Sequence, residues 1–430
     1  MSTDKIKIKG TPQIGLLGTT LGFFFGFAAV SLYGPTAIKF KEAMGLSPAL
    51  IGLLVAIPAL SGSLLRIPFG AWVDITGGRR PFLVLLVLSL IGLGGVTWLL
   101  YSTYPDRMDN LYGLILFLGF LSGCGIATFS VGIGQTSYWF PKNKQGYALG
   151  TYAGLGNLAP GLFSLILPIY LQHYGFISAY FAWFLFLLLG TIAYALIGTN
   201  SYFFQFRKAG NTVSVSREKA EKLGQELFPS GNVRDSLVNS ARMQNTWKLV
   251  AIYFTTFGGF IALTAWFPIY WSQFHGFSPV KAGVFTATFS ILASVFRVIG
   301  GSIADRAGGE KTSMLSLFVV LAASILLIFT QTAGVGFIGA ILLATGMGIN
   351  NAAVFKLVPN YVPKAIGGAA GWIGGLGAFG GFVIPPLMGQ IVNIWGKSGY
   401  SKGFVIFTLL AIFNLLIIYG LLKRASKPGA

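Results

Sequence analysis

Twelve stretches of about 20 mainly apolar residues recur along the chain, and they restrict its fold more than any other feature. A stretch of this length crosses a bilayer as one α-helix, because a helix satisfies its own backbone hydrogen bonds. A transmembrane β-barrel would instead show segments of about ten alternating residues. We therefore predict an all-α polytopic membrane protein with twelve transmembrane helices near residues 13–38, 48–73, 81–101, 111–138, 146–171, 176–198, 247–272, 279–304, 312–331, 334–357, 365–392 and 403–422.

The charge distribution predicts the orientation of these helices. The net charge is +19, but the lysines and arginines cluster between apolar stretches and form no basic domain, so we expect no nucleic-acid partner. Most of them fall on the side that holds both termini and the 199–246 loop, which the positive-inside rule assigns to the cytoplasm. The first stretch is too long for a removable signal peptide. The single cysteine, Cys124, excludes an internal disulfide.

Two segments of the chain repeat each other at an offset of 231 residues. The repeat extends upstream of Arg66 and Arg297 at the same offset. Further downstream the offset is shorter by about ten residues. The matched groups are Gly45, Ser47, Pro48 and Gly52 with Gly276, Ser278, Pro279 and Gly283; Arg66, Gly70 and Asp74 with Arg297, Gly301 and Asp305; Pro141-Lys142 with Pro363-Lys364; and Gly154-Leu155-Gly156 with Gly375-Leu376-Gly377. We predict two pseudo-symmetric halves of six helices, at 1–198 and 247–430, joined by a cytoplasmic linker loop at 199–246. Parallel repeats of this kind place a substrate at the midplane, where the halves meet.

The central linker carries many basic and acidic residues in alternation. This pattern is typical of a solvated tether without chemistry of its own. We expect no more than one short helix in it, around Ser216 to Glu226.

Arg66 and Arg297 each lie inside an apolar stretch. A charge in mid-membrane costs about 2.5–3.5 kcal/mol on insertion scales and normally has a partner. None of the 11 acidic residues lies deep in an apolar stretch, so we infer that a transported anion supplies the counter-charge. Two planar, forked guanidinium groups can clamp a small planar oxyanion. The alternative is that both arginines are structural and donate to helix carbonyls.

Three further polar residues within apolar stretches are candidates for the site or for coupling. Asn157, about three turns into the fifth helix, is expected either to donate its amide to the anion or to bond a neighbouring helix. Tyr253 is expected to donate its hydroxyl to the anion or to lie in the interfacial aromatic belt. Lys356 either extends to the cytoplasm or takes part in substrate or proton coupling.

The eleventh stretch is rich in glycine, which lets neighbouring backbones or a ligand approach closely. Its Gly-x-Gly pattern has no preceding strand, so we exclude a nucleotide-binding loop. The sequence shows no nucleophile-base pair and no metal-ligand cluster. We expect neither an enzyme nor a cofactor or metal.

The Gly-x-x-x-Asp-x-x-Gly-Gly turns after the second and eighth stretches resemble the signature of the major facilitator superfamily. More specifically, Ala153–Asn157 and Gly374–Phe382 resemble the paired nitrate signatures of the nitrate/nitrite porter family. Ser61–Arg66, and Tyr253 followed by Thr256-Phe257-Gly258, fit the same family. The resemblance covers nearly the whole chain and implies the major facilitator fold.

The resemblance also implies roles for individual residues. Arg66 and Arg297 would grip nitrate, with Asn157 and Tyr253 donating hydrogen bonds. The remaining binding residues, implied by close backbone approach, are Gly154, Gly156, Gly375 and Gly377. The implied gate consists of Asp74 and Asp305 with their neighbours Gly70 and Gly301.

Two coupling modes stay open. Family members exchange nitrate for nitrite or import nitrate with protons, and Phe355–Pro359 is closer to the proton-coupled branch. The lack of a central carboxylate favours exchange, while Lys356 is the candidate coupling residue in the second case.

The expected partners are therefore nitrate, nitrite, the lipid bilayer and, for symport, protons. We expect a monomer in a bacterial inner membrane. The alternatives are an organic-anion exchanger of the oxalate/formate type and a transporter-like nitrate sensor.

Overall fold

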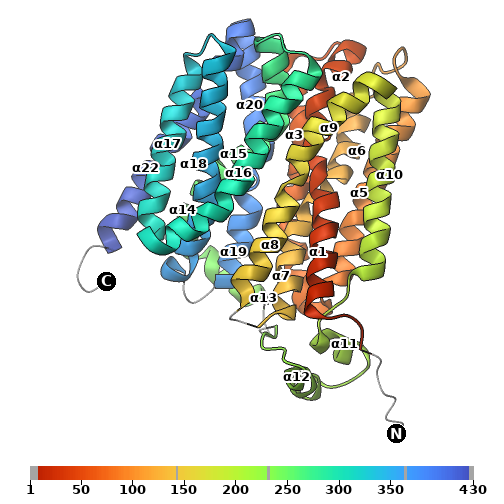
Figure 1. The fold of residues 1–430 in the computed structure, drawn as a ribbon, viewed down its shortest axis with the longest axis vertical. Helices are drawn as coiled ribbons and strands as arrows, with labels where there is room; N and C mark the ends of the chain where they lie inside the picture. The colour runs from red at the N-terminus through yellow and green to blue at the C-terminus, as the bar shows by residue number, and fades with distance from the viewer. Residues whose placement is uncertain (1–7, 142–143, 230–232, 363–365, 426–430) are drawn as a thin grey trace.

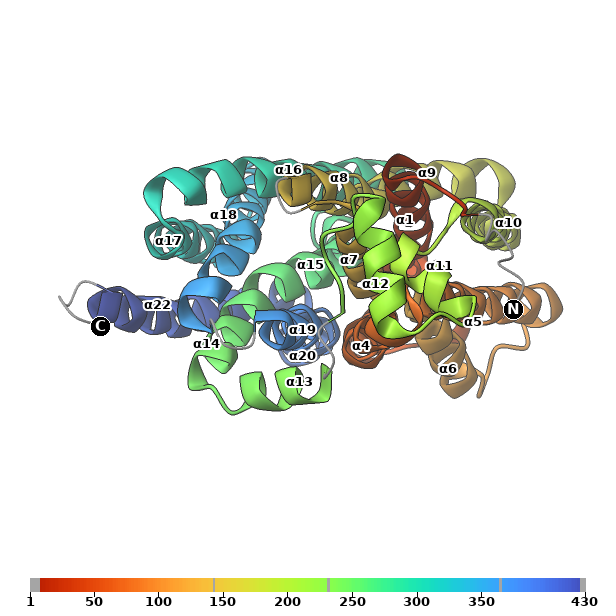
Figure 2. The same ribbon diagram turned by 90° about the horizontal axis from the view of Figure 1, so that it is seen from below.

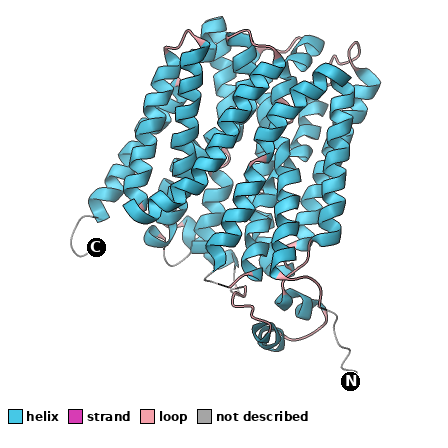
Figure 3. Cartoon of the chain, in the orientation of Figure 1, coloured by secondary structure: helices cyan, strands magenta, loops and turns pink. Residues whose placement is uncertain are grey.

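The computed structural model describes residues 8–141, 144–229, 233–362 and 366–425. Lys142, Pro363 and Lys364, which help to align the two halves, lie outside the described residues. Within these ranges the regular structure is helical (Figure 3). Twelve spans among the described residues are long and apolar enough to cross a membrane. The predicted all-α polytopic membrane fold is thus confirmed.

Six spans build the N-terminal half, and four of them consist of more than one helical segment. Their elements are α1 (Pro12–Phe27), η1 (Ala28–Ser31), η2 (Gly34–Thr36), α2 (Ala37–Met44), α3 (Pro48–Leu64), α4 (Arg66–Thr76), α5 (Arg79–Thr103), α6 (Tyr112–Ser122), η3 (Gly123–Ala127), α7 (Thr128–Trp139), α8 (Gln145–Asn157), α9 (Ala159–Tyr174) and α10 (Phe176–Ile197). The fifth span, α8 and α9, is interrupted as well, at Leu158.

Six spans build the C-terminal half. Their elements are α14 (Gln244–Tyr253), η5 (Phe254–Gly258), α15 (Gly259–Ile269), η6 (Tyr270–Phe274), α16 (Pro279–Ala307), α17 (Gly309–Ile328), α18 (Ala333–Tyr361), α19 (Ile366–Leu376), α20 (Gly380–Trp395), η7 (Gly396–Ser398), α21 (Gly399–Lys402) and α22 (Val405–Ala425). The two halves lie side by side (Figure 1). α1 begins and α22 ends at the end of the bundle that also carries the linker, which we call the linker end; the other is the far end.

The upstream part of the repeat has a local structural cause. Gly45 and Gly276 have φ values of 61° and 69°, in the left-handed region that glycine adopts without strain. Ser47 then caps α3, and Ser278 caps α16 in the same way by accepting from a backbone N–H three residues on. The proline that follows each serine occupies the first helical turn, where its missing N–H costs nothing. The matching residues therefore start the two helices that carry the arginines.

The linker contains more structure than the sequence indicated. Three helices replace the single short one expected around 216–226: α11 (Tyr202–Lys208), α12 (Val213–Lys222) and α13 (Val233–Ala241). The expectation was wrong because the apolar residues of this segment are few but pack together. Phe203, Phe204, Phe206 and Ala220 form a separate small core.

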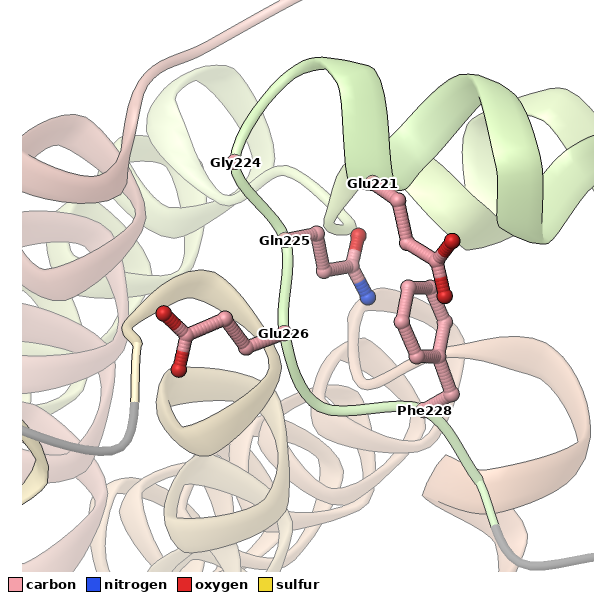
Figure 4. Close-up of a pocket in the computed structure, with 5 residues that line it drawn as sticks. All are labelled: Glu221, Gly224, Gln225, Glu226 and Phe228. Carbon is pink, nitrogen blue, oxygen red and sulfur yellow. The ribbon is translucent and has the colours of Figure 1, made fainter.

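The first two linker helices pack on the N-terminal half. The rings of Phe204 and Tyr138 lie 5.3 Å apart, and Figure 1 shows α11 and α12 below α1 and α7. The chain after α12 is held by Gln225, which accepts from the backbone N–H of Phe203 and donates to the carbonyl of Leu227. Figure 4 shows this segment with Phe228 beside it.

The third linker helix belongs to the C-terminal half. The backbone N–H of Gly368 donates to Ser236 Oγ at 3.1 Å, and Trp372 Nε1 donates to the carbonyl of Leu237 at 3.0 Å. Figure 2 shows α13 beside α19. The linker is thus divided between the two halves; the division of the chain at 198 and 246 stays a prediction.

Candidate functional site

Several helices are interrupted at the depth of the predicted binding residues. Arg66 is the first residue of α4, directly after a break at Leu65. Tyr253 is the last residue of α14, where the backbone passes into the π-helical segment η5. α19 ends at Leu376, and α20 begins only at Gly380. Interrupted helices and π-helical turns recur at binding sites, because they free backbone groups and redirect side chains.

Arg66 is fully buried and extends between the two halves. Its Nε donates to the carbonyl of Gly62 at 3.0 Å in its own half. Its Nη1 donates to the carbonyl of Gly374, in α19, at 2.9 Å. These two bonds are what the structural alternative predicts, but they do not account for the whole group, because the buried Nη2 has no partner.

Arg297 lies within the uninterrupted helix α16. Its Nη2 donates to the hydroxyl oxygen of Tyr253 at 3.2 Å, while its Nη1 is buried without a partner. In the part of the chain that the structure describes, neither Arg66 nor Arg297 forms a salt bridge. Each guanidinium group therefore retains one buried nitrogen without a partner.

The two arginines share the same pair of aromatic rings. The Cζ atom of Arg66 lies 4.8 Å from the ring centre of Phe129 and 5.2 Å from that of Phe257. The Cζ atom of Arg297 lies 5.8 Å and 5.2 Å from the same two centres. These distances are typical of cation–π contacts. The structure thus brings residues 231 positions apart into one cluster.

A cavity of about 810 Å³ extends from this cluster toward the linker end. Its wall includes both arginines, Phe129 and, farther along, Asp74 and Asp305. Ser236 and Leu237 of α13 also line it, so the linker contributes to its mouth. The arrangement is a passage with a cationic inner end and two carboxylates near its opening.

Close contacts between the halves occupy the far side of the cluster. A Cβ atom on Gly52 would overlap the carbonyl of Pro385, and one on Gly389 would overlap that of Pro48. These glycines bring α3 and α20 into backbone contact. In the same way, Gly283 allows α16 to lie close to the carbonyl of Ser164 in α9. The halves therefore meet at the far end and separate toward the linker end.

The four predicted binding glycines have different surroundings. Gly154 lines the cavity. Gly156 makes room for the Phe23 ring, and Gly375 for Ile67 of the opposite half. Gly377 lies against Tyr253, whose Cδ1 would be 2.6 Å from an added Cβ. Three of these four glycines thus serve close packing around the site, and their contact with an anion stays a prediction.

Asn157 ends α8 next to the opposite half. Its carbonyl accepts from Ser294 Oγ of α16 at 3.2 Å, and its side-chain oxygen is buried without a partner. Asn157 does not belong to the cavity wall. Its predicted role as a donor to the anion is untested by this geometry.

The predicted gate residues Gly70, Gly301, Asp74 and Asp305 all line the cavity. Asp74 accepts a hydrogen bond from the Tyr138 hydroxyl, in the same half, at 2.5 Å. Asp305 forms a salt bridge with Lys356, again within one half, and both side chains are about half exposed or more. Lys356 is thus paired with an acidic residue near the opening and is not part of the cavity wall.

Sequence reasoning missed Phe129 and did not single out Phe257. The rings are only two among 38 phenylalanines, so composition could not distinguish them. A usable signal existed for Phe257 alone, because it lies one turn after Tyr253 in the motif already quoted.

Comparisons with known proteins agree with this architecture. Residues 19–385 and 286–430 match the family model described as Major Facilitator Superfamily. A probable nitrate/nitrite antiporter, NarK1 of Thermus thermophilus, is 29% identical, with 96% of this chain and 92% of that protein covered. A nitrite extrusion protein of Bacillus subtilis (strain 168) is 30% identical, with 93% and 92% covered. The partially occluded inward-open structure of the xylose transporter XylE from E. coli has a TM-score of 0.71 at 14% identity, covering 96% of this chain and 99% of that one.

Proposed function

Because the chain belongs to the major facilitator superfamily and, within it, to the nitrate/nitrite porter family, we propose that it transports nitrate and nitrite, binding the anion between Arg66 and Arg297. Membership of this family makes it an integral membrane transporter and not an enzyme. The named relatives supply the class of substrate, since their names refer to nitrate and nitrite. The proposed mechanism of binding and transport is argued from the residues that line and surround the cavity.

One observation carries the assignment of the site. Both guanidinium groups lie against Phe129 and Phe257, and each keeps one buried nitrogen unpaired. Two cations repel each other in a medium of low dielectric constant, and a bound monovalent anion offsets part of this repulsion. Nitrate and nitrite are flat and accept hydrogen bonds in their molecular plane, so two flat donors on either side suit them.

The surrounding groups fit a small anion. Tyr253 accepts from Arg297 through its oxygen, which leaves its own proton free to donate to the ligand. The aromatic faces give the cluster an apolar lining, which favours a weakly hydrated ion. No carboxylate of the described residues contacts the guanidinium groups, so no acidic side chain in these ranges competes with the substrate for them.

Transport follows by rocking of one half against the other. The cavity opens at the linker end, and the glycine contacts bring the halves together at the far end. Because Arg66 and Arg297 come from opposite halves, an anion held by both draws the halves together and favours the step in which the linker end closes. The empty site lacks this attraction, which favours exchange over return of the empty carrier.

We propose exchange as the coupling mode for a second reason. Lys356 forms a salt bridge with Asp305 and does not belong to the wall of the cavity that leads to the arginines, so its described contacts give it no place beside the substrate. The Thermus relative is named as an antiporter. Proton symport is the competing outcome of the test below.

The orientation follows from charge. The linker end carries most of the described basic residues outside the spans, so we place it, with both termini, in the cytoplasm. Because the named relatives are bacterial, we propose a bacterial inner membrane as its location. The carrier acts as a monomer in this proposal, because the site is complete within one chain.

Counterflow in proteoliposomes tests both the substrate and the coupling. Vesicles loaded with nitrite should accumulate labelled nitrate, with no dependence on an imposed pH gradient. Uptake into empty vesicles that requires an inward proton gradient would establish symport instead. Binding of nitrate without any flux would favour the transporter-like sensor.

Variants and competitors test the site. Arg66→Lys and Arg297→Lys should each lower exchange by on the order of 100-fold, since lysine is a point charge without the flat fork. Near-normal exchange in both variants would contradict the clamp. Excess oxalate should leave labelled nitrate uptake unchanged, whereas competition by oxalate would favour the organic-anion exchanger.

A further inference from the structure

Asn351 of α18 is a buried polar residue that the proposed mechanism does not use. It is 3% exposed, its side-chain oxygen has no partner, and it lines the same cavity as Arg297. The adjacent Asn350 is absent from that wall, and its oxygen accepts from Ser313 at 2.7 Å. A desolvated, unpaired carboxamide facing a cavity points to a ligand that completes its hydrogen bonds.

Helix packing gives the depth of Asn351. A Cβ on Gly348 would lie 2.8 Å from Cβ of Phe296, and one on Gly300 would lie 2.6 Å from Cα of Ile349. Residues 348 and 349 of α18 are therefore at the level of residues 296–300 of α16, which include Arg297. Asn351 follows two residues later, about 3 Å farther toward the linker end. It thus lies within about one helical turn of the arginine level.

The internal repeat supports the same placement. Pro141-Lys142 and Pro363-Lys364 match at an offset of 222 residues, and this offset pairs Asn351 with Phe129. Phe129 is the ring that contacts both guanidinium groups in the N-terminal half. Because pseudo-symmetric repeats place equivalent residues on opposite sides of one site, Asn351 occupies the equivalent position in the C-terminal half.

We propose that Asn351 is a further anion-contacting residue, to which the monovalent oxyanion passes when it leaves Arg297 toward the linker end. This proposal rests on the proposed function and deepens it. The unpaired oxygen of Asn351 is an acceptor and cannot itself bind an anion. Turning the carboxamide by 180° puts its NH₂ group in that unpaired position, from which it donates to the anion. A neutral donor holds an anion less tightly than a guanidinium group does, so it assists release without trapping the substrate.

The test separates binding from turnover in the full-length protein. Potassium nitrate binding is measured by calorimetry, and nitrite/nitrate exchange is measured in proteoliposomes. Asn351→Ala should bind nitrate within about threefold of the parent protein but exchange it about tenfold more slowly, which corresponds to one lost neutral hydrogen bond. Asn351→Asp, which places a negative charge on the exit path, should be slower still. Asn350→Ala is the matched control and should exchange normally once folded.

Parental exchange rates in Asn351→Ala would overturn the proposal. So would a loss of binding as large as that of Arg297→Lys, because Asn351 would then belong to the arginine site itself. Asn351→Gln keeps the carboxamide and should exchange within about threefold of the parent; a rate as slow as that of the alanine variant would also count against the proposal. Failure of the parent protein to bind nitrate at all would instead refute the proposed function.

Discussion

The hydroxyl oxygen of Tyr253 accepts a hydrogen bond from Nη2 of Arg297, with 3.2 Å between the two atoms. The bond connects the end of α14 with the middle of α16, and its geometry depends on the π-helical turn that follows Tyr253. It orients the guanidinium group so that Nη1 is left for a ligand. Several expected outcomes follow from this arrangement and from the contacts around it.

Replacing Tyr253 by phenylalanine should weaken nitrate binding by about tenfold or more, because a hydrogen bond to a charged group contributes about 1.5–3 kcal/mol. The ring remains, so its stacking on Phe257, at 4.9 Å between centres, should keep the fold intact. Calorimetric titration with nitrate measures the loss. Tyr112→Phe, whose hydroxyl donates to the carbonyl of Leu50 far from the cavity, is the control and should bind normally. Unchanged affinity in Tyr253→Phe would show that the bond plays no part in binding.

Gly377→Val should abolish exchange while Gly374→Ala is tolerated. A side chain at 377 would push against the Tyr253 ring, at a cost of about 1–3 kcal/mol for overpacking. A Cβ at 374 meets nothing within 4 Å, and alanine keeps the carbonyl that binds Arg66. Exchange rates in proteoliposomes compare the two. Equal loss in both variants would mean that glycine is needed there for backbone flexibility and not for space.

Lys356→Arg should leave transport unchanged at every imposed pH gradient. Arginine keeps the positive charge opposite Asp305 but cannot release a proton, so it separates an ion-pair role from a coupling role. Flux is compared with and without a gradient in the same vesicles. Loss of flux in this variant, together with a gradient dependence in the parent protein, would make Lys356 the coupling residue. Thermal stability should change little, since an exposed pair contributes at most about 1 kcal/mol.

Gly52→Val should separate α3 from α20 and shift the carrier away from the conformation that is open at the linker end. The added side chain would overlap the Pro385 carbonyl, which cannot move without its helix. Ser302→Cys in a Cys124→Ser background reports the shift, because Ser302 lines the cavity. Its alkylation by a charged thiol reagent should slow by at least about threefold. Gly113→Val, at a site with nothing within 4 Å, should leave the rate unchanged.

The sequence was sufficient for the fold because its main signals are lengths and repeats. Apolar stretches long enough to cross a bilayer leave little choice but helices, and the offset between Arg66 and Arg297 pairs the two halves. The position of both arginines inside apolar stretches predicted that they lie within the membrane, and the structure finds them together around two rings. The linker was underestimated, because Phe203, Phe204 and Phe206 are too few to give a periodic signal.

The sequence by itself determined the membrane-spanning fold, the repeat and the buried cationic pair, since length, spacing and charge are read directly from it. Only the tertiary structure decided which groups surround that pair. The contacts of Phe129, the pairing of Lys356 with Asp305 and the exposure of Asn351 to the cavity all depend on how each helix is rotated and where it breaks. Helices that are apolar on every side carry no stripe that would indicate their rotation.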